Sequence, residues 1–231
     1  MIEQTILYIH GMGGGGDSRI PSIIKENIDA YAPSSWKVNV VVRTYPFDPE
    51  EAAPLIATWV DELKPQLIVG ESLGSIQAIR IKGLPHIFVS PSLGAPSYLW
   101  KLSFLTLIPG VEALCDWIWK PRPGDRQTLH FSYKTLRKYH AHLKEALANT
   151  PMNGSEDYFF AFFGAHDHYR RTGVVSIRLW NKYFGRSGAV SGKSFPHDSG
   201  AYTIYDGTHF MEENFVHSLL IPKILEVLGS L

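Results

Sequence analysis

The chain is 231 residues long, with 45% apolar and 19% charged residues, so it can bury one substantial core but is short for two domains. This balance excludes an intrinsically disordered chain. Twenty-two basic residues match twenty-two acidic ones, giving a formal net charge of zero. The total charge therefore excludes the basic footprint of a typical nucleic-acid-binding protein, and only a local patch could attract an anionic membrane.

Cysteine content and hydropathy bear on the location of the protein. Cys115 is the one cysteine, which excludes an intramolecular disulfide. The chain starts Met-Ile-Glu-Gln and enters a strand pattern at once, without the basic start and apolar stretch of a secretory signal. We therefore expect a reducing, cytoplasmic location. No uninterrupted apolar run reaches the ~18 residues of a membrane span. The nearest candidate, residues 98–119, is interrupted by Lys101, Pro109, Gly110, Glu112 and Asp116.

Six short apolar runs predict strands. Most are apolar throughout rather than alternating, which is typical of strands covered on both faces. In chain order they span residues 5–10, 38–43, 66–70, 86–90, 158–163 and 202–205.

Segments with helical spacing lie between these runs. An apolar stripe at residues 20–28 follows the first strand, and another at 55–63 follows an acidic opening that suits a helix N-terminus. Further helices are predicted at 75–81 and 132–147, and an amphipathic helix at 211–228 closes the chain.

Strand and helix alternate, so we predict an α/β fold: a doubly wound, mostly parallel six-stranded sheet with helices on both faces. In such a sheet the loops after the first and third strands lie beside the point where the strand order reverses, and ligand sites form there. We expect residues 1–231 to form a single domain.

The longest departure from this alternation lies between the fourth and fifth strands. A single crossover helix needs far less chain than residues 91–151. We therefore predict an inserted helical cap at about residues 92–150. Its tryptophans, Trp100, Trp117 and Trp119, are candidates for lining an apolar substrate pocket, although packing of the insertion onto the body is the favoured explanation for them.

The third strand leads into the sequence GESLG at residues 70–74, a G-x-S-x-G pattern followed by a helical segment. A serine on so tight a strand-to-helix turn has strained backbone angles, and glycine two residues to either side avoids collisions. The helix would aim its first N–H groups at the reacting centre. The pattern predicts Ser72 as a nucleophile; the alternative is that Ser72 only caps the helix.

The first strand ends in His10 and runs into the loop 11–17, GMGGGGD. A strand ending in His-Gly, a glycine-rich loop, and G-x-S-x-G after the third strand together resemble the α/β-hydrolase superfamily, small bacterial esterases in particular. The resemblance extends over nearly the whole chain in its order of elements, except for the insertion. It implies that the backbone amides of Met12 and Leu73 form an oxyanion hole.

The same loop supports a rival interpretation. Gly11, Gly13 and Gly16 also match the G-x-G-x-x-G fingerprint of a protein that binds an NAD(P)-type dinucleotide. That function needs an acidic residue at the end of the second strand, where the chain has Arg43, and it leaves the Ser72 turn unexplained. A P-loop fits less well, because no Gly-Lys-Ser/Thr follows. We expect no cofactor.

In the α/β-hydrolase superfamily the nucleophile is followed along the chain by an acid and then a histidine. The resemblance implies that Asp167, after the fifth strand, is the acid and that His209, after the sixth, is the general base for Ser72. Asp206 is the other acid candidate, and Asp167 could instead only cap the helix that follows it.

A metal site is a further alternative. His166, Asp167 and His168, with His197 and Asp198, include residue types that bind metal ions. We predict no metal, because Ser72 and the two oxyanion donors explain the pattern without one.

These assignments predict a serine hydrolase that cleaves a carboxylic ester or thioester of a small apolar substrate through an acyl-enzyme on Ser72. The preference for esters rests on analogy with the fold. Glu71 is expected to point away from the substrate and orient its loop. The expected partner is a small-molecule ester, with no nucleic acid and no membrane span; the oligomeric state stays open. The alternative in a different class is a relative of the fold that binds a ligand without turning it over.

Overall fold

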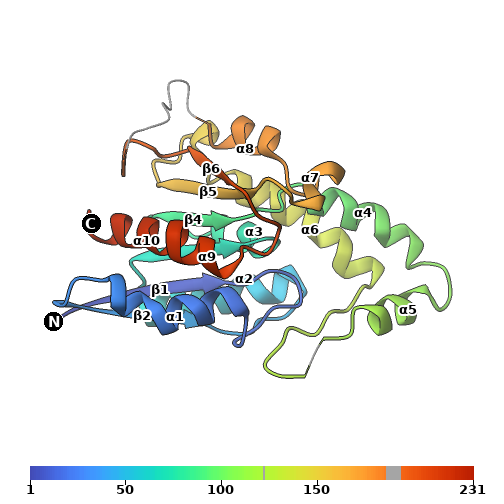
Figure 1. Ribbon diagram of the computed structural model, residues 1–231. Coiled ribbons are helices and arrows are strands. Elements are labelled where there is room, and N and C mark those ends of the chain that lie inside the picture. Colours follow the sequence, from blue (N-terminus) through green and yellow to red (C-terminus); the bar gives the residue numbers. More distant parts are fainter. Residues whose placement is uncertain (122, 186–193) are drawn as a thin grey trace.

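The computed structural model describes residues 1–121, 123–185 and 194–231. It contains one six-stranded sheet in the order β2-β1-β3-β4-β5-β6, in which every neighbouring pair of strands is parallel (Figure 1). The strands are β1 (Ile2–Ile9), β2 (Trp36–Val42), β3 (Leu67–Glu71), β4 (His86–Val89), β5 (Phe159–Gly164) and β6 (Tyr202–Tyr205). All six predicted strands are present, and the predicted doubly wound α/β sheet is confirmed.

The helices that connect the strands include five that the sequence pattern predicted and several shorter ones that it did not. In chain order the helical elements are α1 (Arg19–Tyr31), α2 (Pro49–Leu63), α3 (Gly74–Ile79), α4 (Ala95–Leu105), α5 (Val111–Ile118), α6 (Tyr133–Leu147), η1 (Pro151–Asn153), α7 (His168–Thr172), α8 (Ile177–Tyr183), α9 (Glu213–Phe215), η2 (Val216–Leu220) and α10 (Ile221–Leu228). None of the helices in the described parts of the chain combines the length and hydropathy needed to cross a membrane.

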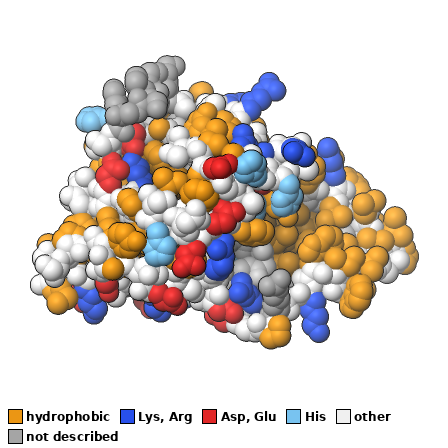
Figure 2. Space-filling view, in the orientation of Figure 1, with side chains coloured by type: hydrophobic (Ala, Val, Ile, Leu, Met, Phe, Trp, Pro, Cys, Tyr) orange, Lys and Arg blue, Asp and Glu red, His pale blue; other side chains and the backbone are white. Residues whose placement is uncertain are grey.

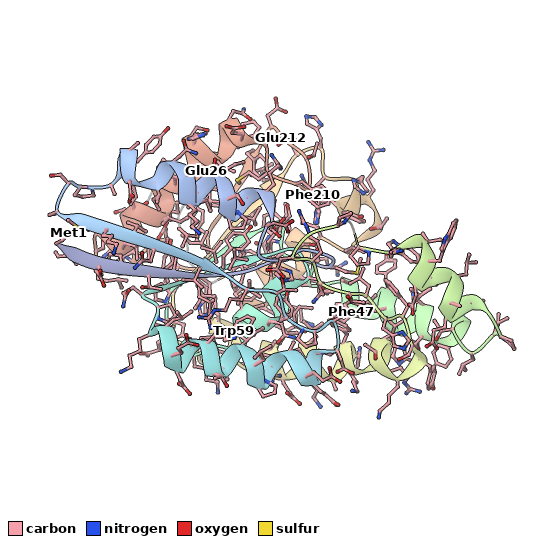
Figure 3. The ribbon with its side chains drawn as sticks, turned by 90° about the horizontal axis from the view of Figure 1, so that it is seen from below. Met1, Glu26, Phe47, Trp59, Phe210 and Glu212 are labelled. Atoms are coloured by element: carbon pink, nitrogen blue, oxygen red, sulfur yellow. The ribbon has the colours of Figure 1, made fainter. Side chains whose placement is uncertain are left out.

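The sheet is buried on both faces, which explains why its strands are apolar throughout. Alternate side chains of β1 enter different cores: Leu7 belongs to the core that contains residues of α2, α3, α6 and α8, whereas Ile6 belongs to the core that contains residues of α1 and α10. Figure 3 shows the two sides, with Glu26 of α1 on one and Trp59 of α2 on the other. The period of two along each strand therefore distributes the apolar residues between two helical layers.

The topology brings the two unusual loops together. Strand β1 pairs with β2 on one side and with β3 on the other, and Ile9 lies opposite Gly70 in the parallel register. The strand order reverses between β1 and β3. The glycine-rich loop and the turn at Ser72 therefore leave neighbouring strands at the same edge of the sheet, where ligand sites form in folds of this kind.

The segment between β4 and β5 has two parts. Helix α6 packs on α2 and α3, and its Leu136 and Tyr139 are buried in one of the two cores. Helices α4 and α5 extend beyond the carboxyl ends of the strands (Figure 1). We propose that the chain is one domain with an insertion at about 92–150. Within that range, α6 packs against the sheet-covering helices as part of the main body.

The helix predicted over about 211–228 is present, but it starts two residues later and contains a π-helical turn. Met211 is buried in the preceding loop, the helix begins at Glu213, and η2 is a π-helical turn just before α10. Pro222 lies in the first turn of α10 and has no N–H to donate to the preceding turn. A widened turn at that point accommodates the missing hydrogen bond.

Candidate active site

Three side chains from separate loops form a continuous hydrogen-bonded chain. Nε2 of His209 lies 2.9 Å from Oγ of Ser72, and Nδ1 of His209 lies 2.8 Å from Oδ2 of Asp167. Both His209 and Asp167 are 3% exposed. The three residues follow β3, β5 and β6, so the parallel sheet brings together positions separated by up to 137 residues.

Ser72 lies on a strained strand-to-helix turn. Its φ of +50° is in the left-handed region, which costs a non-glycine residue about 1–2 kcal/mol. A Cβ on Gly74 would overlap the carbonyl oxygen of His10, and one on Gly70 would lie 2.9 Å from Cβ of Ala78. Gly70 therefore lets α3 pack closely on β3, and Gly74 lets α3 approach the end of β1. The alternative that Ser72 caps α3 is wrong, because the N-cap is Leu73 and no side chain caps the helix.

The two carboxylate oxygens of Asp167 have different partners. Oδ1 accepts a hydrogen bond from the backbone N–H of Tyr169 at 2.8 Å and so caps α7, while Oδ2 binds His209. Helix capping and contact with the histidine are therefore not alternatives here. Asp206, the other acid candidate, is exposed and binds Nε2 of His166 at 2.7 Å rather than His209.

The loop that carries His209 is fixed on both sides of the imidazole. Thr208 donates its backbone N–H and its hydroxyl to the Glu212 carboxylate, at 3.1 and 2.8 Å. Arg19 of α1 donates to the carbonyl oxygen of Met211 at 2.7 Å. Figure 3 shows Phe210 and Glu212 close together on this loop, on the α1 side of the sheet. These bonds hold the imidazole in one orientation.

The glycine-rich loop touches the nucleophile turn. A Cβ on Gly11 would lie 2.9 Å from Cβ of Ser72. Within the described residues, the backbone amides of Met12 and Leu73 donate to no protein acceptor. Both amides are thus free to bind a ligand group beside Ser72.

Gln127 joins the insertion to this loop and was not identified from the sequence. Its Oε1 accepts from the N–H of Gly13 at 3.1 Å, its Nε2 donates to the carbonyl of Tyr45 at 3.1 Å, and its own N–H donates to Gly14 at 2.6 Å. The side chain is buried. No local pattern marks a glutamine 114 residues away from its partner.

Ser92 is a second residue that sequence reasoning missed. Its Oγ lies 3.1 Å from Oγ of Ser72, and its backbone N–H donates to the Ser72 carbonyl at 3.0 Å. It is buried, in the loop that follows β4. The signal available in the sequence was its place just after a strand adjacent to β3.

Burial controls the charge of the groups around Ser72. Glu71 is buried and accepts a hydrogen bond from Tyr8 Oη at 2.8 Å; burial raises its pKa, and the hydrogen bond from Tyr8 and the nearby His209 oppose the rise. Its side chain is thus bonded to β1 rather than to Ser72. Burial lowers the pKa of His10 to about 4, so the ring is neutral at pH 7, where it stacks on Tyr45 at 4.3 Å.

The three tryptophans of the insertion are exposed. Trp100, Trp117 and Trp119 have exposed fractions of 38%, 73% and 40%. Packing onto the body therefore does not explain Trp117, and this interpretation is wrong for it. Trp119 contacts the buried Phe131 ring at 4.9 Å.

The residues weighed as metal ligands do not converge. His166 binds Asp206, Asp167 binds His209, and Asp198 binds Lys223 at 2.5 Å. Across the described part of the chain, no group of three or more His, Cys, Asp or Glu side chains is placed to hold one ion.

The chain is similar to several solved structures, although no family model and no curated protein matches its sequence. Among solved structures, a monoacylglycerol lipase from Paleococcus ferrophilus matches 98% of this chain and 94% of its own, with a TM-score of 0.63 at 17% identity. Est1E from Butyrivibrio proteoclasticus, with ferulic acid bound, matches 98% and 90% with a TM-score of 0.62 at 14% identity. MenH from S. aureus matches 98% and 94% with a TM-score of 0.54 at 13% identity. The chain therefore has the α/β-hydrolase fold, as its motifs and their order led us to expect.

Proposed function

We propose that the protein is a serine hydrolase that cleaves a carboxylic ester or thioester through an acyl-enzyme on Ser72. The observation that carries this proposal is the chain of hydrogen bonds from Asp167 through His209 to Ser72, at 2.8 and 2.9 Å. A hydroxyl needs a base to become a nucleophile, and the base needs a partner that fixes its tautomer. This arrangement supplies both.

Proton positions follow from the partners. The carboxylate of Asp167 can only accept, so Nδ1 of His209 carries the hydrogen and Nε2 is the basic nitrogen. Nε2 accepts the Ser72 proton as Oγ attacks the carbonyl carbon of the substrate. The imidazolium that forms is stabilised by Asp167.

The negative charge that develops on the substrate oxygen needs donors. The free amides of Met12 and Leu73 are our candidates, because their loop and turn adjoin Ser72. His209 then protonates the departing alcohol or thiol. Water, deprotonated by the same Nε2, attacks the acyl carbon and releases the acid together with the free Ser72 hydroxyl.

The substrate class rests on two supports. The most similar solved structures named above include a lipase and a protein with ferulic acid bound, which favours carboxylic esters. Met12 and Phe210, which neighbour Ser72 and His209 through their loops, are 42% and 57% exposed. An apolar rim of this kind favours a small apolar acyl or alcohol group. Substrate binding by the three tryptophans of the insertion, Trp100, Trp117 and Trp119, is a less favoured part of this proposal.

The dinucleotide alternative meets an electrostatic obstacle. A pyrophosphate on the glycine-rich loop would approach the Asp125 carboxylate, since a Cβ on Gly16 would overlap Oδ2 of Asp125. Asp125 is held there by the Thr44 hydroxyl at 2.5 Å. A carboxylate repels a pyrophosphate at the position where this fingerprint needs free N–H groups.

Labelling with a fluorophosphonate, followed by mass mapping, tests the proposal. Ser72 should take up the probe, and Ser72→Ala and His209→Ala should abolish labelling. Ser75→Ala is the matched control, because Ser75 is a buried serine on the same turn whose hydroxyl binds the carbonyl of Gly70.

A folded wild-type protein that resists the probe would overturn the proposal. Ester hydrolysis and ligand affinity, measured for the wild type and Ser72→Ala, identify a protein that binds without turnover. In that case neither form would hydrolyse an ester, and Ser72→Ala would leave the affinity unchanged. A panel of nitrophenyl esters and acyl thioesters of increasing chain length would then rank the acyl groups.

A further inference from the structure

Exposed apolar side chains are concentrated on one short stretch of the described chain. Ten of the nineteen large hydrophobic residues that are exposed fall between residues 98 and 119, on α4, on α5, in the turn between them and just after α5. We call them the α4–α5 face: Tyr98, Trp100, Phe104, Leu105, Leu107, Ile108, Leu114, Trp117, Ile118 and Trp119. This is the same stretch whose hydropathy came nearest to a membrane span in the sequence, but it folds into two short helices instead.

These helices bury little of their own surface. Helix α5 buries one residue, Cys115, while Trp117 and Ile118 at its end are 73% and 54% exposed. Figure 2 shows hydrophobic side chains covering the end of the molecule where α4 and α5 lie. Single exposed apolar residues are common on proteins, but a contiguous group of this size marks a binding surface.

The charges beside this face are unpaired cations. Lys101 lies over the Tyr98 ring at 5.6 Å, and Arg137 lies over the Phe104 ring at 5.9 Å. Within the described residues neither has an acidic partner, nor does the exposed Lys120 at the end of α5.

The two acidic residues of α5 both contact one histidine. Glu112 and Asp116 lie 3.0 and 2.7 Å from the two ring nitrogens of His130. The three cations Lys101, Lys120 and Arg137 outnumber these two carboxylates, so the charge beside the face is net positive, although the whole chain is formally neutral.

We propose that the α4–α5 face docks on a lipid bilayer that contains anionic lipid. Tryptophan mixed with leucine and isoleucine suits the boundary between headgroups and acyl chains. Lysine and arginine at the margin can keep their charge in the headgroup layer and bind lipid phosphates there. A pair of short helices would lie in this layer without spanning it.

Charge complementarity favours a bilayer over a second copy of the chain. A two-fold dimer through this face would bring two copies of the patch that carries Lys101, Lys120 and Arg137 against each other. Glu112 and Asp116 offset only two of these three charges in each copy, so a net repulsion remains. An anionic lipid surface supplies the missing negative charge directly.

The α4–α5 face lies at the same end of the molecule as Ser72. Helix α4 follows β4, so the face lies at the carboxyl end of the sheet, the same end as the Ser72 turn. Docking would hold the candidate active site near the membrane surface. The proposal itself concerns binding and does not depend on turnover.

Flotation with vesicles tests it. The wild-type protein should co-float with vesicles of phosphatidylcholine containing about 30% phosphatidylglycerol, and less with phosphatidylcholine alone or at high salt. The double variant Trp117→Ser/Ile118→Ser should lose roughly tenfold or more of its vesicle partitioning, because two exposed apolar side chains are removed. Lys101→Gln/Lys120→Gln should lower only the part that depends on anionic lipid.

Control variants distinguish membrane docking from the proposed hydrolase activity and from dimerisation. Met152→Ser/Ile204→Ser removes two exposed apolar side chains elsewhere, 60% and 48% exposed, and should float like the wild type. Ser72→Ala should also float like the wild type, so loss of hydrolysis and loss of docking are distinguished. No co-flotation of the wild type with anionic vesicles overturns the proposal. So does a dimer in light scattering that Trp117→Ser/Ile118→Ser dissolves, because a second copy would then cover the face.

Discussion

The hydroxyl oxygens of Ser72 and Ser92 lie 3.1 Å apart, and this contact defines the hydrogen bonding of the proposed nucleophile. If Ser72 donates its proton to Nε2 of His209, its Oγ accepts from Ser92. The backbone N–H of Ser92 also donates to the Ser72 carbonyl at 3.0 Å. Ser92 therefore fixes the rotamer of Ser72 and strengthens its bond to the oxygen as negative charge develops there.

Replacing Ser92 by alanine should lower kcat for an activated ester about fivefold to tenfold, with little change in KM. This loss corresponds to one hydrogen bond that contributes about 1–1.4 kcal/mol in the transition state. Steady-state kinetics would measure the split. Ser75→Ala is the control, because its hydroxyl binds only the Gly70 carbonyl. An equal loss of kcat in both variants would contradict a role for Ser92 at the nucleophile.

The variant Asp167→Asn should lower kcat by about a thousandfold or more while the protein stays folded. The new side chain would retain an oxygen to cap α7, but its amide group would donate toward His209 and favour the wrong tautomer. Burst and steady-state assays with circular dichroism would check this.

Asp206→Asn provides the comparison for Asp167→Asn. Asp206 is exposed and pairs with His166, so this variant should keep nearly full activity. If Asp206→Asn were the more damaging change, our assignment of the acid would be wrong.

Alanine in place of Gln127 should lower both activity and stability. The change leaves the Gly13 N–H and the Tyr45 carbonyl without partners, at about 1–3 kcal/mol for a buried pair, and it frees the loop that carries the Met12 amide. We expect kcat to fall about tenfold or more, and urea denaturation to show the loss of stability.

Glutamate in the same place separates the two contacts of Gln127. Gln127→Glu keeps an acceptor for Gly13 and loses the donor to Tyr45. Because Gln127 is buried, the carboxylate oxygen would face the Tyr45 carbonyl oxygen, and this variant should be less stable than Gln127→Ala at neutral pH. An unchanged kcat in Gln127→Ala would exclude a role for this contact in positioning the loop.

Acidification should destabilise the fold through three buried histidines. Burial lowers the pKa of His10, His86 and His142 to about 4, whereas an unfolded histidine titrates near 6.5. Between these values the unfolded chain binds protons that the folded chain does not. The free energy of unfolding is therefore unaffected by these histidines above about pH 6.5. As the pH falls from 6.5 toward 4, each histidine lowers it by about 1.4 kcal/mol per pH unit.

The variant His142→Gln isolates one of these contributions. It should reduce the slope of unfolding free energy against pH by about 1.4 kcal/mol per unit between about pH 6 and 4.5. The exposed His140 on the same helix gives the matched control, His140→Gln. Glu71, whose pKa is raised by burial, acts in the opposite sense in both backgrounds and cancels in the comparison. A slope that does not change in His142→Gln would contradict the prediction.

Local patterns were sufficient for the features that depend on neighbouring residues. Strands buried on both faces must be apolar throughout, so the six runs could be recognised without a partner in view. The turn at Ser72 needs glycine nearby because backbones approach closely there. A helical insertion was predicted there, but the bounds of α4 and α5 were not, because their apolar residues face outward, which no rule for buried helices anticipates.

The sequence by itself determined the parallel α/β sheet and the order in which Ser72, Asp167 and His209 follow its strands, because period and turn chemistry are local properties of the chain. Only the tertiary structure decided that both Asp167 oxygens are used, that Ser92 and Gln127 contact the site, and that Trp117 faces outward. These features depend on contacts between positions up to 114 residues apart, and on which side of a helix the body leaves uncovered. Such distances are set by packing, and packing is a property of the whole fold rather than of any segment.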